Sequence, residues 1–257
     1  MKTEAAMAAF AKINKACYTK NSSQQSEADF FQFSSEFIHN NPRFVEQKKM
    51  VNNLYNLIIS DTTKLCYKNC LKLYPENARI LDVGIGNGIM IKKNHKLIKE
   101  KNLQITGLDI NRHYLEHCRK MIRVFGLEGQ VKVFHQSVVS FKPPMDLCYD
   151  YVFFGMSFML MNDQKQVLER TKQWLQPDGK VVFFQTMFKN RSKIMEFVKP
   201  RLKFLTTVDF GKVTYEKDFY ELLNQEKLSP CEDRVLKKNV FKGEYRLIVT
   251  QPQSVMH

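Results

Sequence analysis

Residues 80–88 read Ile-Leu-Asp-Val-Gly-Ile-Gly-Asn-Gly, an apolar strand that runs directly into a cluster of glycines. The chain has only 10 glycines, yet Gly84, Gly86 and Gly88 fall within five residues. Glycine suits backbone that adopts a positive φ or lets a ligand approach closely. At the end of a first parallel strand, that ligand is usually a nucleotide-like cofactor. The stretch therefore predicts a strand, a cofactor-binding loop and then a helix.

Two acidic residues narrow the choice of ligand. Asp109 ends the next predicted strand, about twenty residues beyond the last glycine, where a carboxylate can accept hydrogen bonds from ribose hydroxyls. Asp82 lies within the first strand, where its charge would repel a pyrophosphate and favour an ammonium or sulfonium group. A dinucleotide site prefers Gly-x-Gly-x-x-Gly, whereas the spacing here is Gly-x-Gly-x-Gly. The pattern thus argues against a dinucleotide.

Short apolar strands alternate with helical stretches around this motif. Helices are predicted at 89–101, 114–125, 164–175 and 215–225, and strands at 79–83, 104–109, 131–135, 151–154, 180–185, 234–240 and 244–250. Such alternation indicates βαβ units and a mostly parallel sheet. The last two strands lie close together around Lys242-Gly243, so we expect them to pair as an antiparallel hairpin.

The N-terminal region has a different, helical pattern. Ser26 followed by Asp29 resembles a capping box, and Asn41-Pro42 resembles a helix start. A third helix is predicted from about residue 61 to 73, and Pro75 ends it. We therefore expect residues 1–78 to form a helical cap or lid and residues 79–257 to form the α/β core, within one compact domain overall.

The motif at 80–88 closely resembles the first motif of the class I S-adenosylmethionine-dependent methyltransferases. Further landmarks of that family follow in order, at Asp109, 149–152 and 175–179, so the resemblance covers about residues 78–251. It implies a Rossmann-like, seven-stranded, mostly parallel sheet with an antiparallel last strand, and S-adenosyl-L-methionine as cofactor. It also implies that Asp109 binds the ribose, that Ile110 packs on the adenine, and that Ser137 replaces the aspartate that the family often places near the adenine amino group. The cofactor-binding residues predicted in this way are Asp82, Gly84, Gly86, Asn87, Gly88, Asp109, Ile110, Asn111, Gln136, Ser137, Val138 and Gly155.

The sequence says less about the substrate. Phe154-Gly-Met-Ser157 is not the Asn/Asp-Pro-Pro-Tyr/Phe signature of enzymes that methylate planar nitrogens, which counts against nucleobase methylation by that route. We expect methyl transfer to nitrogen or oxygen of a small organic substrate. Candidate pocket residues are Met156, Met159, Phe188 and Tyr215, with ordinary core packing or a connecting role as the alternative for each. No catalytic residue is assigned, because a general base is needed only if the nucleophile arrives protonated.

Composition indicates a folded protein in a reducing compartment. The chain has 257 residues, of which 44% are hydrophobic and 26% charged, which excludes wholesale disorder. Its longest apolar stretch, 151–161, is far too short to cross a bilayer. The six cysteines show no paired framework. We therefore expect a cytoplasmic protein without a membrane span; the sequence does not specify its oligomeric state.

Charge and two further patterns keep other functions open. The net charge of +14 favours an RNA methyltransferase as the first alternative, although the basic excess is spread along the chain without a basic tail. A non-catalytic, cofactor-binding interaction subunit is the second. His113-Tyr-Leu-Glu-His117 matches a zinc-protease pattern. It falls on a helix where no cleft is expected, so no metal is predicted.

Overall fold

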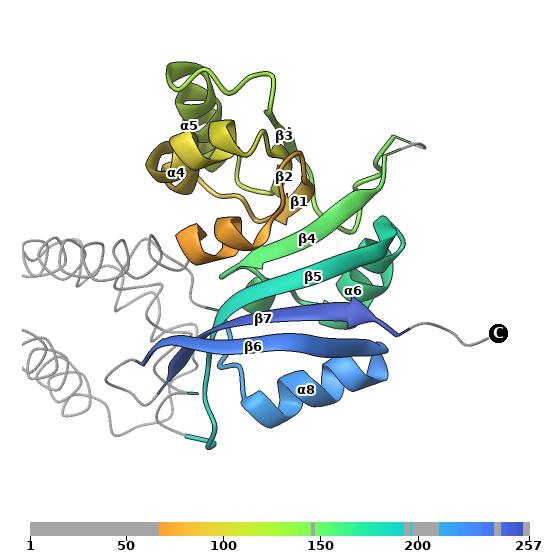
Figure 1. The fold of residues 1–257 in the computed structure, drawn as a ribbon. Helices are drawn as coiled ribbons and strands as arrows, with labels where there is room; N and C mark the ends of the chain where they lie inside the picture. The colour runs from red at the N-terminus through yellow and green to blue at the C-terminus, as the bar shows by residue number, and fades with distance from the viewer. Residues whose placement is uncertain (1–66, 145–146, 193–195, 197–210, 239–242, 254–257) are drawn as a thin grey trace, which may run out of the picture. The chain divides into compact units, whose positions relative to one another are not determined.

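The computed structural model describes residues 67–144, 147–192, 196, 211–238 and 243–253 (Figure 1). The predicted helices at the start of the chain lie outside these residues, except for the end of the third. Residues 67–73 are helical, and the helix stops before Pro75 as predicted. The division into a cap and a core at residue 78 stays a prediction.

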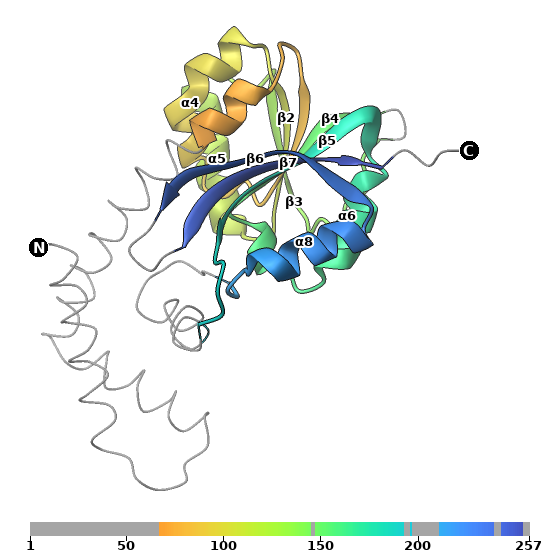
Figure 2. The ribbon, with the colours of Figure 1, turned by 60° about the horizontal axis from the view of Figure 1, so that its bottom comes forward.

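The described residues form a seven-stranded sheet with helices on both faces (Figures 1 and 2). The strand order is β3-β2-β1-β4-β5-β7-β6. The neighbours from β3 to β5 are parallel, and β7 is antiparallel to both β5 and β6. The predicted α/β fold, with its antiparallel last strand and hairpin, is confirmed. The strands are β1 (Arg79–Val83), β2 (Gln104–Asp109), β3 (Val131–His135), β4 (Tyr149–Gly155), β5 (Leu175–Met187), β6 (Leu228–Lys238) and β7 (Glu244–Pro252).

The helices cover two separate apolar cores. On one face, α4 (Ile89–Glu100), α5 (Arg112–Val124) and residues 67–74 pack against the sheet through side chains such as Ile91 and Leu115. On the other face, α6 (Gln164–Lys172), α8 (Glu216–Gln225) and the 3-10 helix η1 (Phe158–Leu160) bury Leu168 and Phe219. None of the helices within the described ranges is long and apolar enough to span a membrane.

The region between α6 and β5 differs from the prediction. The helix ends at Lys172, and β5 begins at Leu175, within the predicted turn at 175–179. Leu175 pairs with Tyr149 and Lys180 with Tyr151, so the residues between them bulge out of the ladder. Pro177 lies in this bulge, where its missing N–H removes no hydrogen bond from the ladder. The turn therefore interrupts the strand instead of preceding it.

The strand order places the glycine motif at a switch point of the sheet. From β1 the chain continues to β2 and β3 on one side, and then returns to place β4 on the other side. In open α/β sheets, ligands bind at the carboxyl ends of strands at such a point. Gly84 to Gly88 follow the carboxyl end of β1 directly, so the fold puts them where a ligand is expected.

Candidate functional site

All three glycines of the loop adopt a left-handed backbone. Their φ angles are +83° at Gly84, +69° at Gly86 and +77° at Gly88, a region that other residues rarely adopt. The N–H groups of Gly84 and Ile85 both donate to the carbonyl of Leu108, at 2.8 and 3.1 Å. These two hydrogen bonds tie the loop to the end of β2 before α4 begins. The left-handed backbone explains why the sequence needs glycine at these positions.

The surroundings separate the roles of the three glycines. A Cβ at Gly84 would lie 2.5 Å from the Ser157 Cβ, and one at Gly88 would lie 2.7 Å from the Cys118 Cα. These two glycines let other parts of the protein pack closely. A Cβ at Gly86 would meet nothing within 4 Å. Gly86 therefore presents its backbone to open space, which a ligand can enter.

Asp109 lies beside this open space at the end of β2. Its Oδ2 accepts a hydrogen bond from the Gly86 N–H at 2.9 Å, and its Oδ1 accepts one from the Asn111 N–H at 2.8 Å. Each carboxylate oxygen can accept further bonds, so ribose hydroxyls can still bind here. The next residue, Ile110, is 74% exposed and offers an apolar surface. Open backbone, a fixed carboxylate and an exposed apolar side chain together suit an adenosyl group.

Asp82 lies beneath the loop and not on its open side. It is 2% exposed, and its Oδ2 accepts a hydrogen bond from the Tyr67 hydroxyl at 2.7 Å. Burial raises the pKa of Asp82 to about 7; the Tyr67 hydrogen bond opposes this rise, and the nearby Asp109 adds to it. Burial thus favours the protonated form of this carboxyl group far more than water does for an ordinary aspartate.

The other residues predicted to bind the cofactor surround the same loop or follow β3 and β4. Asn111 caps α5, since its side chain accepts a hydrogen bond from the Tyr114 N–H at 3.2 Å. The Ser137 hydroxyl accepts one from the Val139 N–H at 3.3 Å, while Val138 is buried. The remaining positions are Asn87 and Gln136, both exposed, and Gly155 at the end of β4. Their contact with a cofactor stays a prediction.

The candidate pocket residues are mostly packed. Met159, Phe188 and Tyr215 are 5–6% exposed, and Met156 is half-buried with a φ of +61°. The Tyr215 hydroxyl donates to the Glu196 carboxylate at 2.8 Å. Phe188 and Tyr215 form an isolated β-bridge, so the structure brings these two predicted residues together. Their role in binding a substrate stays a prediction.

Sequence reasoning missed two side chains that hold the loop. Tyr67 binds Asp82, and the buried Ser157 hydroxyl donates to the Val83 carbonyl. Both contacts join segments distant in the chain, and neither belongs to a local motif. The sequence offers one signal for the second contact, the small residue Ser157 just after β4. A small residue is needed there because it packs directly against Gly84.

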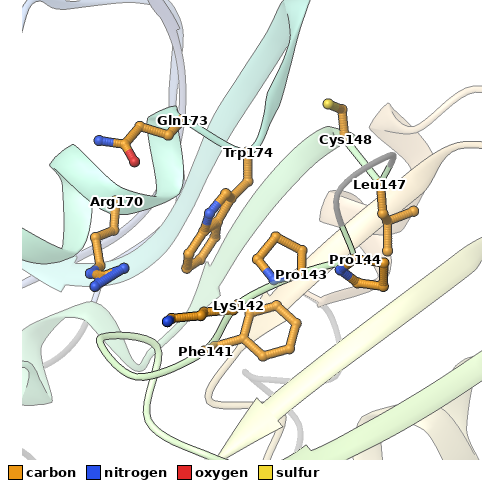
Figure 3. A pocket seen from close by; sticks show the side chains of 9 residues that line it. All are labelled: Phe141, Lys142, Pro143, Pro144, Leu147, Cys148, Arg170, Gln173 and Trp174. Carbon is orange, nitrogen blue, oxygen red and sulfur yellow. The ribbon is translucent and has the colours of Figure 1, made fainter.

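A pocket of about 260 Å³ lies elsewhere in the fold (Figure 3). The charged ends of Lys142 and Arg170 lie on the same side of it, beside the Trp174 indole (Figure 3). The pocket is found at the amino ends of β4 and β5, whereas the glycine loop follows the carboxyl end of β1. It is therefore separate from the site described above. Its lining residues are Phe141, Lys142, Pro143, Pro144, Leu147, Cys148, Arg170, Gln173 and Trp174.

The zinc-protease pattern lies on the surface of α5. The side chains of His113 and Glu116 are 91% and 53% exposed, and they contact each other at 3.6 Å. In the described part of the chain, no three His, Cys, Asp or Glu side chains gather in a way that could hold a metal ion.

Comparison with known proteins agrees with this geometry. Residues 80–179 match the family described as a methyltransferase domain. This match and the geometry of the loop both support the predicted resemblance to the class I S-adenosylmethionine-dependent methyltransferases and the predicted cofactor, S-adenosylmethionine.

Among individual proteins, the chain is 31% identical over 160 residues to the ubiquinone/menaquinone biosynthesis C-methyltransferase UbiE of Wigglesworthia glossinidia brevipalpis. The match covers 61% of this chain and 58% of that relative, so the chain spans less than two thirds of the relative's length.

Solved structures share the fold at low sequence identity. Geranyl diphosphate C-methyltransferase from Streptomyces coelicolor A3(2) has a TM-score of 0.59 at 11% identity, covering 83% of this chain and 86% of that one. The [4+2]-cyclase SpnF has a TM-score of 0.58 at 13% identity, covering 79% and 82%. At these identities the likeness concerns the fold alone.

Proposed function

We propose that the chain is an enzyme that transfers a methyl group from S-adenosylmethionine to a small organic acceptor. The observation that carries this proposal is the open space over Gly86, with the Asp109 carboxylate beside it, in a methyltransferase motif. When bound, the cofactor supplies an electrophilic methyl group on a sulfonium. The chain's own residues then have to hold the adenosyl group and orient the acceptor, which can contribute up to ~7–11 kcal/mol to the rate.

We further propose that the acceptor atom is carbon, in place of the nitrogen or oxygen expected from the sequence. The support is the likeness to a relative named as a C-methyltransferase of ubiquinone and menaquinone biosynthesis. In such a transfer a new carbon–carbon bond forms, the sulfur–methyl bond breaks, and the acceptor carbon gives up a proton to solvent or to a base. A ring of the hydroquinone type is the acceptor class that this likeness favours.

Met156 and Met159 follow β4, close to the site, and have a proposed role in the substrate pocket. Met156 lies next to the Gly155 that ends β4, and its N–H donates to the Phe184 carbonyl at 2.7 Å. This hydrogen bond fixes the backbone where the chain leaves the sheet. Flexible thioether side chains suit an apolar acceptor, because they adapt to irregular surfaces.

The test uses the full chain and a donor labelled with ¹³C in its methyl group. Hydroquinones, phenols, amines and an unstructured RNA are offered separately, with the Asp109→Ala variant as a control for donor binding. The ¹³C chemical shift of the product distinguishes a methyl group on carbon from one on nitrogen or oxygen. We expect labelled carbon on a hydroquinone-type acceptor. Label only on nitrogen or oxygen, whichever acceptor carries it, would overturn the carbon assignment, and donor binding without transfer would favour the non-catalytic alternative.

A further inference from the structure

The pocket beside Trp174 lies apart from the site proposed for methyl transfer. It is found at the amino ends of β4 and β5, and it shares no lining residue with the glycine loop. Its volume is about 260 Å³, slightly below the roughly 300–1,000 Å³ of pockets that hold drug-sized ligands. A ligand with one ring and one polar group therefore suits it in size.

The aromatic wall of this pocket is fixed by hydrogen bonds on both sides of Trp174. The Trp174 N–H donates to the Thr171 carbonyl at 3.2 Å, and the Trp174 carbonyl accepts a hydrogen bond from the Tyr149 N–H at 2.7 Å. The indole meets the buried Phe141 ring edge to face, with ring centroids 5.6 Å apart. The indole itself is half-buried, so part of its surface faces the pocket. A flat ring can therefore pack on an aromatic surface that is already in place.

Two cations face the pocket without an acidic partner. Lys142 lies in the loop before β4 and Arg170 in the last turn of α6, and their charged ends lie on the same side of the pocket (Figure 3). None of the residues that line the pocket is acidic. In the described part of the chain, neither charged group forms an ion pair or a hydrogen bond. Asp146, in the same loop as Lys142, lies outside the described residues.

Another cation of α6 shows the contrast. Lys165 lies 3.9 Å from the Glu169 carboxylate, one turn further along the helix. The negative end of the helix dipole favours a cation at Arg170, but it does not account for Lys142, which belongs to a separate segment. Two like charges that face the same space repel each other, and an anion bound between them would replace this repulsion with attraction.

We propose that this pocket is a second ligand site, which binds a phosphate monoester that carries one aromatic ring. The Arg170 guanidinium matches the geometry of phosphate oxygens, and the Lys142 ammonium adds a second positive charge. A phosphate monoester carries close to two negative charges at neutral pH, whereas a carboxylate carries one. The ring packs against Trp174. This inference does not depend on the proposed methyl transfer, because the pocket and the glycine loop lie at opposite ends of the parallel strands.

Trp174 is the only tryptophan of the chain, so tryptophan fluorescence reports on this pocket alone. The full chain is titrated with phenyl phosphate, benzoate, inorganic phosphate and phenol, and calorimetry measures each affinity independently. We expect a saturable fluorescence change with phenyl phosphate, at an affinity several-fold tighter than for the other compounds. Equal affinity for inorganic phosphate would refute the role of the ring, and tighter binding of benzoate would refute the choice of a phosphate.

Charge variants test the two cations. Lys142→Gln and Arg170→Gln each remove one positive charge from the pocket, so each should weaken the binding of phenyl phosphate roughly fivefold. Lys165→Gln is the matched control, because it removes one positive charge from α6 outside the pocket lining. It should keep the wild-type affinity. An equal loss in all three variants would show a response to net charge alone and would overturn the assignment.

Two further measurements locate the bound anion. Saturation with S-adenosylhomocysteine should leave the affinity for phenyl phosphate unchanged, and competition between the two would refute a separate site. Heat of binding without a fluorescence change would place the anion elsewhere, with the same consequence.

Quenching of the wild-type chain keeps the inference testable should a charge variant fail to fold. Iodide is attracted by a positive pocket and neutral acrylamide is not, so raising the salt to about 1 M should weaken quenching of Trp174 by iodide more than quenching by acrylamide. An equal effect of salt on both quenchers would overturn the inference.

Discussion

Replacing Gly86 with alanine should damage donor binding much more than it damages the fold. The φ of +69° makes any other residue costly, by ~1–2 kcal/mol for a left-handed conformation. In a chain of this size that cost lowers Tm by roughly 2–8 °C. No steric clash adds to it, because a Cβ at this position meets nothing within 4 Å. The new methyl group would, however, occupy the space proposed for the donor.

Gly88→Ala is the matched comparison. Its φ is also left-handed, at +77°, but its Cβ would lie 2.7 Å from the backbone Cα of Cys118, which cannot turn aside. Overpacking of this kind typically costs a further ~1–3 kcal/mol. We therefore expect a larger fall in Tm for Gly88→Ala than for Gly86→Ala.

Thermal unfolding and calorimetric titration with S-adenosylmethionine measure both effects. For Gly86→Ala we expect a folded protein whose donor affinity is reduced by about tenfold or more, which corresponds to at least ~1.4 kcal/mol. Wild-type affinity in this variant would refute the claim that the donor enters the space over Gly86. Equal destabilisation by the two substitutions would refute the distinction between an open and a packed glycine.

Further substitutions test the carboxylates and one buried cation. Asp109→Ala should weaken donor binding by ~1.5–3 kcal/mol, the range for a hydrogen bond to a charged group. Titration calorimetry measures this affinity, and an unchanged value would show that Asp109 does not bind the ribose. Because the folded pKa of Asp82 is raised from 3.8 to about 7, its ionisation destabilises the folded state progressively as pH rises from about 4 to about 7. Without ligand at pH 8, Asp82→Asn should therefore have a higher free energy of unfolding in urea than wild type, by a difference of the order of 4 kcal/mol. This difference should disappear near pH 4. A difference that stays constant with pH would contradict the prediction. The Arg246 guanidinium binds the carboxylates of Glu216, at 2.9 Å, and Asp233. Arg246→Met leaves both carboxylates without this partner, so it should lower the free energy of unfolding by roughly 3 kcal/mol while donor affinity stays unchanged. A loss in urea unfolding of less than about 1 kcal/mol would show that these ion pairs contribute little.

The strands near the glycine motif were predictable because their signals are local. The bounds of β1, β2 and β3 match the predicted ranges, since each is a short apolar run with turn residues on both sides. The glycine loop and Asp109 also depend on spacing along the chain, and the structure brings them together through the Gly86–Asp109 hydrogen bond. Here sequence pattern and tertiary structure agree.

Other features depend on contacts that no local pattern records. The sequence does not show that β5 would begin within the 175–179 turn, because that depends on pairing between Leu175 and Tyr149. The Tyr67–Asp82 hydrogen bond arises from the packing of a helix against the sheet. The burial of Phe188 likewise follows from its pairing with the segment before α8. Each case needed the fold before the contact could be seen.

The most direct test of the account is a crystal structure of the full chain with S-adenosylhomocysteine bound. The distance that decides is the one between the Asp109 carboxylate oxygens and the ribose hydroxyls. We predict hydrogen bonds of roughly 2.5–3.0 Å there, with the ligand passing over the Gly86 backbone. A ligand held elsewhere, for example in the pocket beside Trp174, or a ribose turned away from Asp109, would contradict the account.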